Sequence, residues 1–349
     1  MKRYDLRHLE EHFPKRVFEL MQISQKGEVS IFIFQIAPNE TLQTLIKNLK
    51  RKGHEVMNSL RFNEVDWTIV VKAFAHEPTP SNPLFDAFEK YGVEVVKFDK
   101  NSAILCIGTH FSKDNSDFVQ DINAQTKELI YMSAQDDLAL QKSAYIKYET
   151  GSEAGVLALI AKTVLRDVQT PQEIKDYLDE LDEGYLSAES NVGEEEIENI
   201  TALLSKPSPL LLLGCDMYEH YDADLIAGLI ALITRFNPLK VSVLDGTQQQ
   251  TKPKTLLPPP INEFKSFDGT IVYFYESNEA KPKLYGSSQF AIAAKLQDGD
   301  EVFIETSSGT FESTFALDKD MKGTIAVLGI KKSGYRYETA TVLKRGSNG

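Results

Sequence analysis

The sequence predicts an α/β protein in three parts: a small N-terminal α-β domain, a central domain with a mainly parallel sheet, and a small C-terminal β-barrel. The 349 residues, 42% of them hydrophobic, are enough for two or three domains. Two proline-rich passages, residues 76–83 and 251–263, separate the segments. Strand and helix patterns alternate in the middle segment, and strand patterns dominate the last. We therefore expect domains at residues 1–75, 84–250 and 264–349.

In the first segment the patterns predict the order helix, strand, helix, strand, strand. Pro14 either bends the first helix or marks its true start. Gly53 suits the position just after the second helix, and Asn63 and Glu64 suit a short turn between the last two strands. The expected elements are a helix over 5–24, a strand over 29–37, a helix over 40–53 and strands over 54–62 and 65–74.

In the middle segment short apolar runs alternate with helical patterns, which favours a mainly parallel sheet. Ser152 is a plausible N-cap of one helix, and Pro171 suits the first turn of the next. The expected strands are 92–99, 103–109, 128–134, 210–214 and 240–246. The expected helices are 152–165, 171–182, 194–205 and 223–236.

The last segment is rich in β-strand patterns with turn residues between them. Asp298-Gly299-Asp300 and Ser308-Gly309 lie where tight turns are needed. Closing the sheet would remove its exposed edges, so we expect a small barrel. The strand-rich stretches are 269–277, 298–318, 323–330 and 335–344.

Charge and cysteine content exclude several classes of function. The net charge is −13, and an acidic protein gains no counterion release from phosphates, so we expect no nucleic-acid partner. Residues 182–199 carry no Lys or Arg, and we expect a solvated charged face or a mobile loop there. The only cysteines, Cys106 and Cys215, are too few for the four thiolates of an ordinary iron–sulfur cluster. They also indicate no disulfide framework, which fits a reducing cytoplasm.

Neither a signal peptide nor a transmembrane helix is predicted. The first residues are charged where a signal peptide needs an apolar core. No window reaches the roughly 18 uninterrupted apolar residues of a membrane span.

The stretch from residue 207 to residue 233 has the most varied chemistry of the chain. Cys215, Asp216, Glu219 and His220 follow a buried strand pattern and precede a helical one. They would lie at the carboxyl end of a strand, where open α/β sheets bind ligands. No catalytic or metal-binding motif accompanies them, and an acid beside Cys215 does not activate a thiolate. We assign no catalytic or metal residue, and we expect any small ligand at residues 215–222.

Two further motifs are weaker. His8 and His12 have the H-x-x-E-H spacing of an inverted zinc-peptidase motif, but a third ligand is missing, so we expect solvated histidines. Residues 151–155, GSEAG, lie at a helix start, where free amides could hold a phosphate. Their spacing matches neither the dinucleotide nor the P-loop fingerprint, so we expect an ordinary capped helix.

The middle and last segments resemble the molybdopterin oxidoreductase superfamily. In that superfamily a strand precedes a helix that opens with the pattern G-[ST]-[DE]-x-[GA]-[VL]-[LM]-x-L. The matching residues are Gly151, Ser152, Glu153, Gly155, Val156, Leu157 and Leu159. Residues 209–233 are similar to its next unit of strand, glycine and helix. The last segment is similar to its C-terminal barrel through Ala294, Leu296, Gly299, Asp300 and Val302.

Within that superfamily the chain is most similar to the large G-type subunit of respiratory complex I, the NADH-quinone oxidoreductase. Residues 58–72 resemble the small E-like subunit of a complex I variant in some bacteria. The resemblances cover most of the chain, apart from residues 166–206. The family's G subunit begins with cysteine-rich iron–sulfur domains, and a standard E subunit ligates a [2Fe–2S] cluster through four cysteines. This chain lacks those domains, and residues 1–75 contain no cysteine.

The resemblance therefore implies a non-catalytic accessory subunit of the complex I peripheral arm. It would bind no cofactor itself, and iron–sulfur clusters in partner subunits would carry the electrons. The complex would hold it at the cytoplasmic side of the inner membrane. Two alternatives stay open. One is a complex I assembly factor, and the other is a small cytoplasmic oxidoreductase or metal-binding enzyme that uses residues 215–224.

Overall fold

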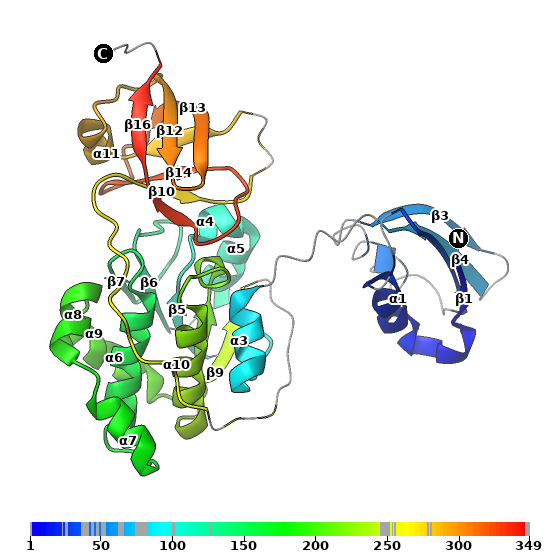
Figure 1. Ribbon diagram of the computed structural model, residues 1–349, viewed down its shortest axis with the longest axis horizontal. Coiled ribbons are helices and arrows are strands. Elements are labelled where there is room, and N and C mark those ends of the chain that lie inside the picture. Colours follow the sequence, from blue (N-terminus) through cyan, green and yellow to red (C-terminus); the bar gives the residue numbers. More distant parts are fainter. Residues whose placement is uncertain are drawn as a thin grey trace. The chain divides into compact units, whose positions relative to one another are not determined.

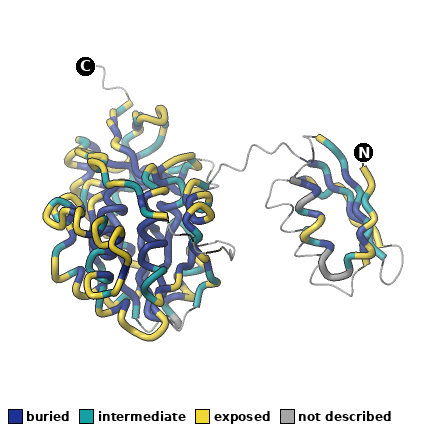
Figure 2. Tube along the Cα trace, turned by 60° about the horizontal axis from the view of Figure 1, so that its bottom comes forward, coloured by how far each residue is buried: buried dark blue, intermediate teal, exposed yellow. Residues whose placement is uncertain are grey.

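The computed structural model shows a mixed α/β protein in two units, residues 1–81 and 82–349 (Figure 1). This confirms the predicted fold class. The residues that the structure describes are 2–22, 24, 27–35, 42, 45–46, 49, 54–61, 66–73, 82–99, 102–125, 128–244, 252, 254, 256–277, 279 and 281–345. Buried positions run through the helices and strands of each unit (Figure 2).

The N-terminal unit contains a four-stranded sheet with the order β1-β2-β4-β3. Its strands are β1 Lys2–Asp5, β2 Val29–Gln35, β3 Glu55–Arg61 and β4 Asp66–Lys72. Helix α1, Phe13–Gln22, packs on one face, where the rings of Phe13 and Phe34 stack with centroids 4.2 Å apart. Alternate side chains of a strand point to opposite faces, so Phe32 and Phe34 of β2 enter this core together.

The first part of this unit differs from the prediction. β1 was not expected, because its residues are mostly exposed and polar and carry no strand pattern. A 3-10 helix, η1 Arg7–His12, precedes α1, and Pro14 lies in the first turn of α1. Of the helix expected over 40–53, only Leu42, residues 45–46 and Leu49 are described, and they are helical. The predicted roles of Gly53 and of the turn at 63–64 fall outside the described residues.

The second unit begins with a five-stranded parallel sheet of order β7-β6-β5-β8-β9. The strands are β5 Ala103–Ile107, β6 Glu128–Ser133, β7 Ala144–Lys147, β8 Pro209–Leu213 and β9 Lys240–Val243. The central strands β5 and β8 are buried at every position. Their continuous apolar runs are typical of parallel strands covered on both faces.

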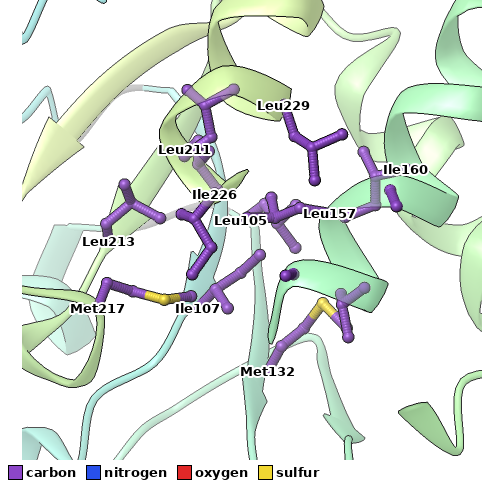
Figure 3. Close-up of a cluster of buried hydrophobic side chains, with 14 of the residues drawn as sticks. Leu105, Ile107, Met132, Leu157, Ile160, Leu211, Leu213, Met217, Ile226 and Leu229 are labelled. Carbon is purple, nitrogen blue, oxygen red and sulfur yellow. The ribbon is translucent and has the colours of Figure 1, made fainter. Parts of the chain in front are cut away.

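Helices cover both faces of this sheet. Leu105 and Leu211 meet α6 and α10 on one face (Figure 3), while Ile104 and Leu210 meet the region of α4 and α5 on the other. The helices and the 3-10 turn of this part are α3 Pro83–Tyr91, α4 Phe111–Asp114, α5 Ser116–Gln125, α6 Glu153–Leu165, α7 Gln172–Asp179, α8 Glu183–Ser190, α9 Glu194–Leu204, η2 Cys215–Met217 and α10 Ala223–Phe236.

One expectation for this part was wrong, and two others hold only in part. Residues 92–99 form no strand, because only Val95 bridges to Val241. For residues 182–199 the mobile loop is wrong, because they contain α8 and the start of α9. The solvated charged face is confirmed, because most of their acidic side chains are exposed. Ser152 is the N-cap residue of α6, as predicted. Its hydroxyl, however, donates to the Glu149 carbonyl oxygen at 2.7 Å and accepts no hydrogen bond from a helix amide.

The rest of the second unit is a curled seven-stranded sheet of order β15-β10-β14-β11-β13-β12-β16 (Figure 1). Its two end strands are consecutive in the chain and separated only by Ala340. Its elements are β10 Ile271–Phe274, β11 Lys283–Gly286, α11 Ser288–Ala293, β12 Glu301–Thr306, β13 Gly309–Leu317, β14 Ile325–Leu328, β15 Tyr337–Thr339 and β16 Thr341–Lys344. Gly299 has a φ of +87°, as the turn before β12 requires.

No helix in the described parts of the chain is both long and apolar enough to span a membrane.

Candidate functional site

The carboxyl ends of β5 and β8 form the position where a parallel sheet of this kind binds ligands. The chain runs from β5 outward to β6 and β7, then returns to place β8 beside β5. The strand order therefore reverses between β5 and β8, and ligands bind at such a switch point. The residues that follow the two strands are 108–110 and 214–216.

At this position the two loops lie directly on each other. Gly214 N–H donates to the Ile107 carbonyl oxygen at 2.9 Å, and Asp216 N–H donates to the Gly108 carbonyl oxygen at 3.0 Å. A Cβ atom on Gly214 would lie 2.0 Å from the Thr109 Cβ and 2.1 Å from the Gly108 oxygen. Only glycine permits this approach, and the loops fill the space between the strand ends themselves.

The four candidate ligand residues all lie in the loop between β8 and α10, as predicted. Asp216 and His220 are each 1% exposed, and Cys215 is 9% exposed. Their side chains engage different groups. Asp216 Oδ1 lies 2.8 Å from the Tyr273 hydroxyl oxygen, Glu219 accepts a hydrogen bond from Gly334 N–H, and His220 faces Glu153. The Asp216 Oδ2 is buried and has no hydrogen-bond partner among the described residues. Ligand binding by this loop stays a prediction.

Asp216 belongs to a buried ionic cluster between the parallel sheet and the curled sheet. The Tyr273 hydroxyl of β10 lies 2.8 Å from the Asp216 Oδ1 and 2.6 Å from the Asp114 Oδ2. Asp114 also accepts hydrogen bonds from the Thr109 hydroxyl at 2.9 Å and from the His110 N–H at 3.0 Å. Arg336, just before β15, forms an ion pair with Asp114.

The proton count of this cluster fixes its charge state. A phenol has one proton, so Tyr273 donates to only one of the two carboxyl groups. Arg336, the Thr109 hydroxyl and the His110 N–H all direct donors to Asp114, so Asp114 is the acceptor of the cluster. Burial raises the pKa of Asp216, and the nearby charge of Asp114 raises it further. Asp216 therefore keeps its proton at neutral pH and donates to the Tyr273 oxygen, which donates to Asp114.

A second buried network contains His220. Its Nδ1 accepts a hydrogen bond from Asp222 N–H at 2.9 Å, so the ring proton lies on Nε2. The Nε2 lies 3.0 Å from the Glu153 Oε2, and the Tyr335 hydroxyl donates to the Glu153 Oε1 at 2.5 Å. Glu153 is fully buried at the start of α6. The first network thus joins the parallel-sheet layer to Tyr273 of β10 and to Arg336, and the second joins it to Tyr335, just before β15.

An open cleft lies beside these networks, where loops after β5 and β6 meet residues 318–322. It has a volume of about 210 Å³ and is lined by His110, Gln135 and Asp137, among others. His110 Nδ1 lies 3.3 Å from both the Asp137 Oδ2 and the Ser112 hydroxyl. A serine hydrolase needs its serine and its acid on different ring nitrogens, so this trio is not a catalytic triad.

Cys106 lies in an environment that disfavours thiolate chemistry. Neither Cys106 nor Cys215 forms a disulfide. Burial raises the pKa of Cys106 well above its usual value. Because the thiolate is the nucleophile and the metal ligand, Cys106 is a core residue rather than a redox group.

The backbone of the H-x-x-E-H motif forms a 3-10 helix rather than an α-helix. His8 is exposed, and residues 8–12 belong to the 3-10 helix η1. With three residues per turn, positions 8 and 12 do not share a face, as they would in an α-helix. Within the described ranges, no group of three or more His, Cys, Asp and Glu residues is arranged to hold a metal ion.

Sequence reasoning missed Asp114, Tyr273 and Arg336. They lie in three segments far apart in the chain, and no local motif links them. Glu153 offered a signal, because it is an acidic residue at the start of an almost wholly apolar helix. Such a residue is buried only when it has partners.

Comparison with known proteins places the N-terminal unit in a family. Residues 1–73 match the family of putative NADH-ubiquinone oxidoreductase E chains. A protein of known structure, HP1264 from Helicobacter pylori, is 41% identical; the match covers 22% of this chain and 100% of HP1264, with a TM-score of 0.19. This unit of the protein belongs to the matched family. None of the curated proteins compared matches the chain.

The chain also has a more distant structural similarity. Acetylene hydratase from Pelobacter acetylenicus is 8% identical, with a TM-score of 0.44, over 73% of this chain and 75% of that chain. A similarity of this size does not assign an activity.

Proposed function

We propose that the chain is a non-catalytic structural subunit of the peripheral arm of a respiratory complex I. Neighbouring iron–sulfur subunits carry the electrons, and the complex holds the chain at the cytoplasmic side of the inner membrane. The N-terminal unit supplies the family relationship, and the second unit supplies a rigid body for docking.

One observation carries the proposal: the N-terminal unit belongs to a family of oxidoreductase subunits and has no cysteine. Residues 1–73 match that family, yet both cysteines of the protein lie outside them. An ordinary iron–sulfur cluster needs four thiolates. A member of an electron-transfer family that lacks the cluster ligands retains the docking surfaces but not the electron path.

The buried networks of the second unit support the same proposal. Asp216 and His220 bind groups of their own chain, and the loops after β5 and β8 touch each other. The hydrogen bonds of these side chains hold two packed layers in one arrangement, and only the Asp216 Oδ2 among their described polar atoms lacks a partner. Buried networks that hold two sheets together are expected of a structural subunit.

The test is to purify the native membrane complex through a small tag on this chain and to identify what co-migrates. We expect iron–sulfur subunits of the peripheral arm at constant stoichiometry through size exclusion and native electrophoresis. If the tagged chain migrates only by itself, without those subunits, the proposal is refuted. A chain found only in immature subcomplexes would identify an assembly factor instead.

Metal analysis of the purified chain tests the enzyme alternative. We expect Fe, Zn, Mo and W all well below one equivalent. A stoichiometric metal that is lost in the Cys215→Ala variant, while the circular dichroism spectrum is unchanged, would favour a metal enzyme that uses residues 215–224.

A further inference from the structure

The sheet of the N-terminal unit has apolar side chains on both faces. Strand β2 reads VSIFIFQ, and its Phe32 and Phe34 are fully buried in the core. Ile31 and Ile33 therefore point to the opposite face, where they are partly exposed. A sheet with one solvated face alternates apolar and polar residues, whereas apolar residues on both faces are typical of a strand covered on both sides.

The strand register places these residues in two rows, which we call the outer face. Arg3, Ile31 and Val70 are paired across β1, β2 and β4. Ile33, Thr68 and Leu60 are paired across β2, β4 and β3. These six residues line a hollow of about 460 Å³.

Thr68 is a buried polar residue in the lining of this hollow. It is 7% exposed, and its hydroxyl has no hydrogen-bond partner among the described residues. Buried hydroxyl groups are normally paired, because an unpaired one loses its bonds to water without compensation. A partner that covers the outer face can supply the missing bond.

Three charged residues line the hollow: Arg3, Arg7 and Asp66. Asp66 accepts a hydrogen bond from the Gln35 amide at 2.9 Å. Arg7 is neutralised by Asp5, with an Nε–Oδ1 distance of 2.9 Å. Arg3 is exposed and has no ion pair among the residues that the structure describes. A partner that fits therefore offers an apolar stripe for the isoleucines, a polar group for Thr68 and a carboxylate for Arg3.

We propose that the outer face binds an amphipathic helix of a neighbouring peripheral-arm subunit, with an acidic residue of that helix against Arg3. A helix is the element that covers residues of several adjacent strands at once, as α1 does on the inner face. The inference rests on the proposed function, since it names the surface through which the chain joins the complex.

The test compares variants of the full-length tagged chain by the amount of iron–sulfur subunits that co-purify. We expect Ile33→Glu to reduce co-purification at least tenfold. Arg3→Glu should reduce it at low salt, with a smaller effect at high salt, because an exposed charge pair is screened. Ile292→Glu is the matched control, because Ile292 is 78% exposed in α11 of the other unit.

Thr68→Val separates docking from folding. The valine removes an unpaired hydroxyl, so the thermal midpoint of the purified chain should stay equal or rise. Co-purification should nevertheless fall, because the bond from the partner is lost. A lower midpoint with normal co-purification would overturn the assignment of Thr68. If Ile33→Glu does not fold, Arg3→Glu carries the test.

The outcomes distinguish the two proposals. If the wild-type chain captures no iron–sulfur subunit, the proposed function fails. If the wild type captures them and Ile33→Glu and Arg3→Glu capture as much as Ile292→Glu, the outer face is not the docking surface. A purified wild-type dimer that Ile33→Glu converts to a monomer would show that a second copy, not a helix of another subunit, covers the face.

Discussion

The free energy of unfolding of the second unit should depend on pH through the buried carboxyl group of Asp216, and Asp216→Asn should remove most of that dependence. Asp216 is buried and hydrogen-bonded to Tyr273, which also donates to Asp114. Burial raises the pKa of Asp216 from 3.8 to about 8 in the folded chain. An asparagine at this position keeps a hydrogen-bond donor for the Tyr273 oxygen and has no proton to lose.

The magnitude follows from the difference in bound protons. Between pH 3.8 and about 8 the folded chain holds the Asp216 proton and the unfolded chain has released it. The free energy of unfolding therefore falls as pH rises, by about 1.4 kcal/mol per pH unit. From pH 5 to pH 7 the wild type should lose about 3 kcal/mol that the variant retains. Asp137, with a pKa lowered to about 2, titrates below this window.

Urea unfolding at several pH values between 5 and 7.5 measures this difference. Far-ultraviolet circular dichroism follows both units, and fluorescence of the single tryptophan, Trp67, follows the N-terminal unit alone. Only the transition of the second unit should differ between wild type and variant. Parallel pH profiles for that transition in the two proteins would refute the assignment of the proton to Asp216.

Two other substitutions and one chemical probe test the packing of the second unit. Arg336→Met should lower the free energy of unfolding by about 3–5 kcal/mol, because it leaves the buried Asp114 carboxylate without its ion pair; urea unfolding at pH 7 measures it. Gly214→Ala should prevent normal folding of the second unit, because its Cβ would lie 2.0 Å from the Thr109 Cβ; circular dichroism and soluble yield report it. The Cys106 thiol should react with a disulfide reagent only as fast as the second unit unfolds, since it is fully buried; stopped labelling in increasing urea checks this.

Matched variants separate these effects from a general loss of stability. Arg345→Met removes an exposed ion pair with Glu301 and should cost less than about 1 kcal/mol. Gly184→Ala, in helix α8, adds a Cβ 3.3 Å from the Asp182 Oδ1 and should change the free energy of unfolding by less than about 1 kcal/mol. If Arg345→Met costs as much as Arg336→Met, burial of Asp114 is not the cause. Rapid labelling of Cys106 under native conditions would contradict its place in the core.

The sequence was most informative where burial dictates the residues. The apolar runs of β5 and β8 predicted a parallel sheet correctly, because a strand buried on both faces tolerates no polar side chain. The strand expected over 92–99 has a similar run of valines, but only Val95 finds a partner in Val241. A local pattern reports β propensity, whereas a strand also needs a neighbour.

The candidate site was located but its partners were not. A glycine after an apolar strand correctly placed residues 215–222 at the carboxyl end of β8. The partners of Asp216 and His220 come from α6 and from the curled sheet. These contacts depend on how the two sheets pack against each other. The hydrophobic periodicity of a single strand or helix does not predict that packing.

The short strands β15 and β16 lie at opposite ends of the curled sheet although only Ala340 separates them. β15 covers the backbone of β10, and β16 covers that of β12. Fraying of this one segment would uncover two strand edges at once, and each would be a template for pairing with another chain. Strand β10 also carries Tyr273 of the buried ionic cluster. The pairing of β15 with β10 therefore protects both a strand edge and the strand that positions this tyrosine.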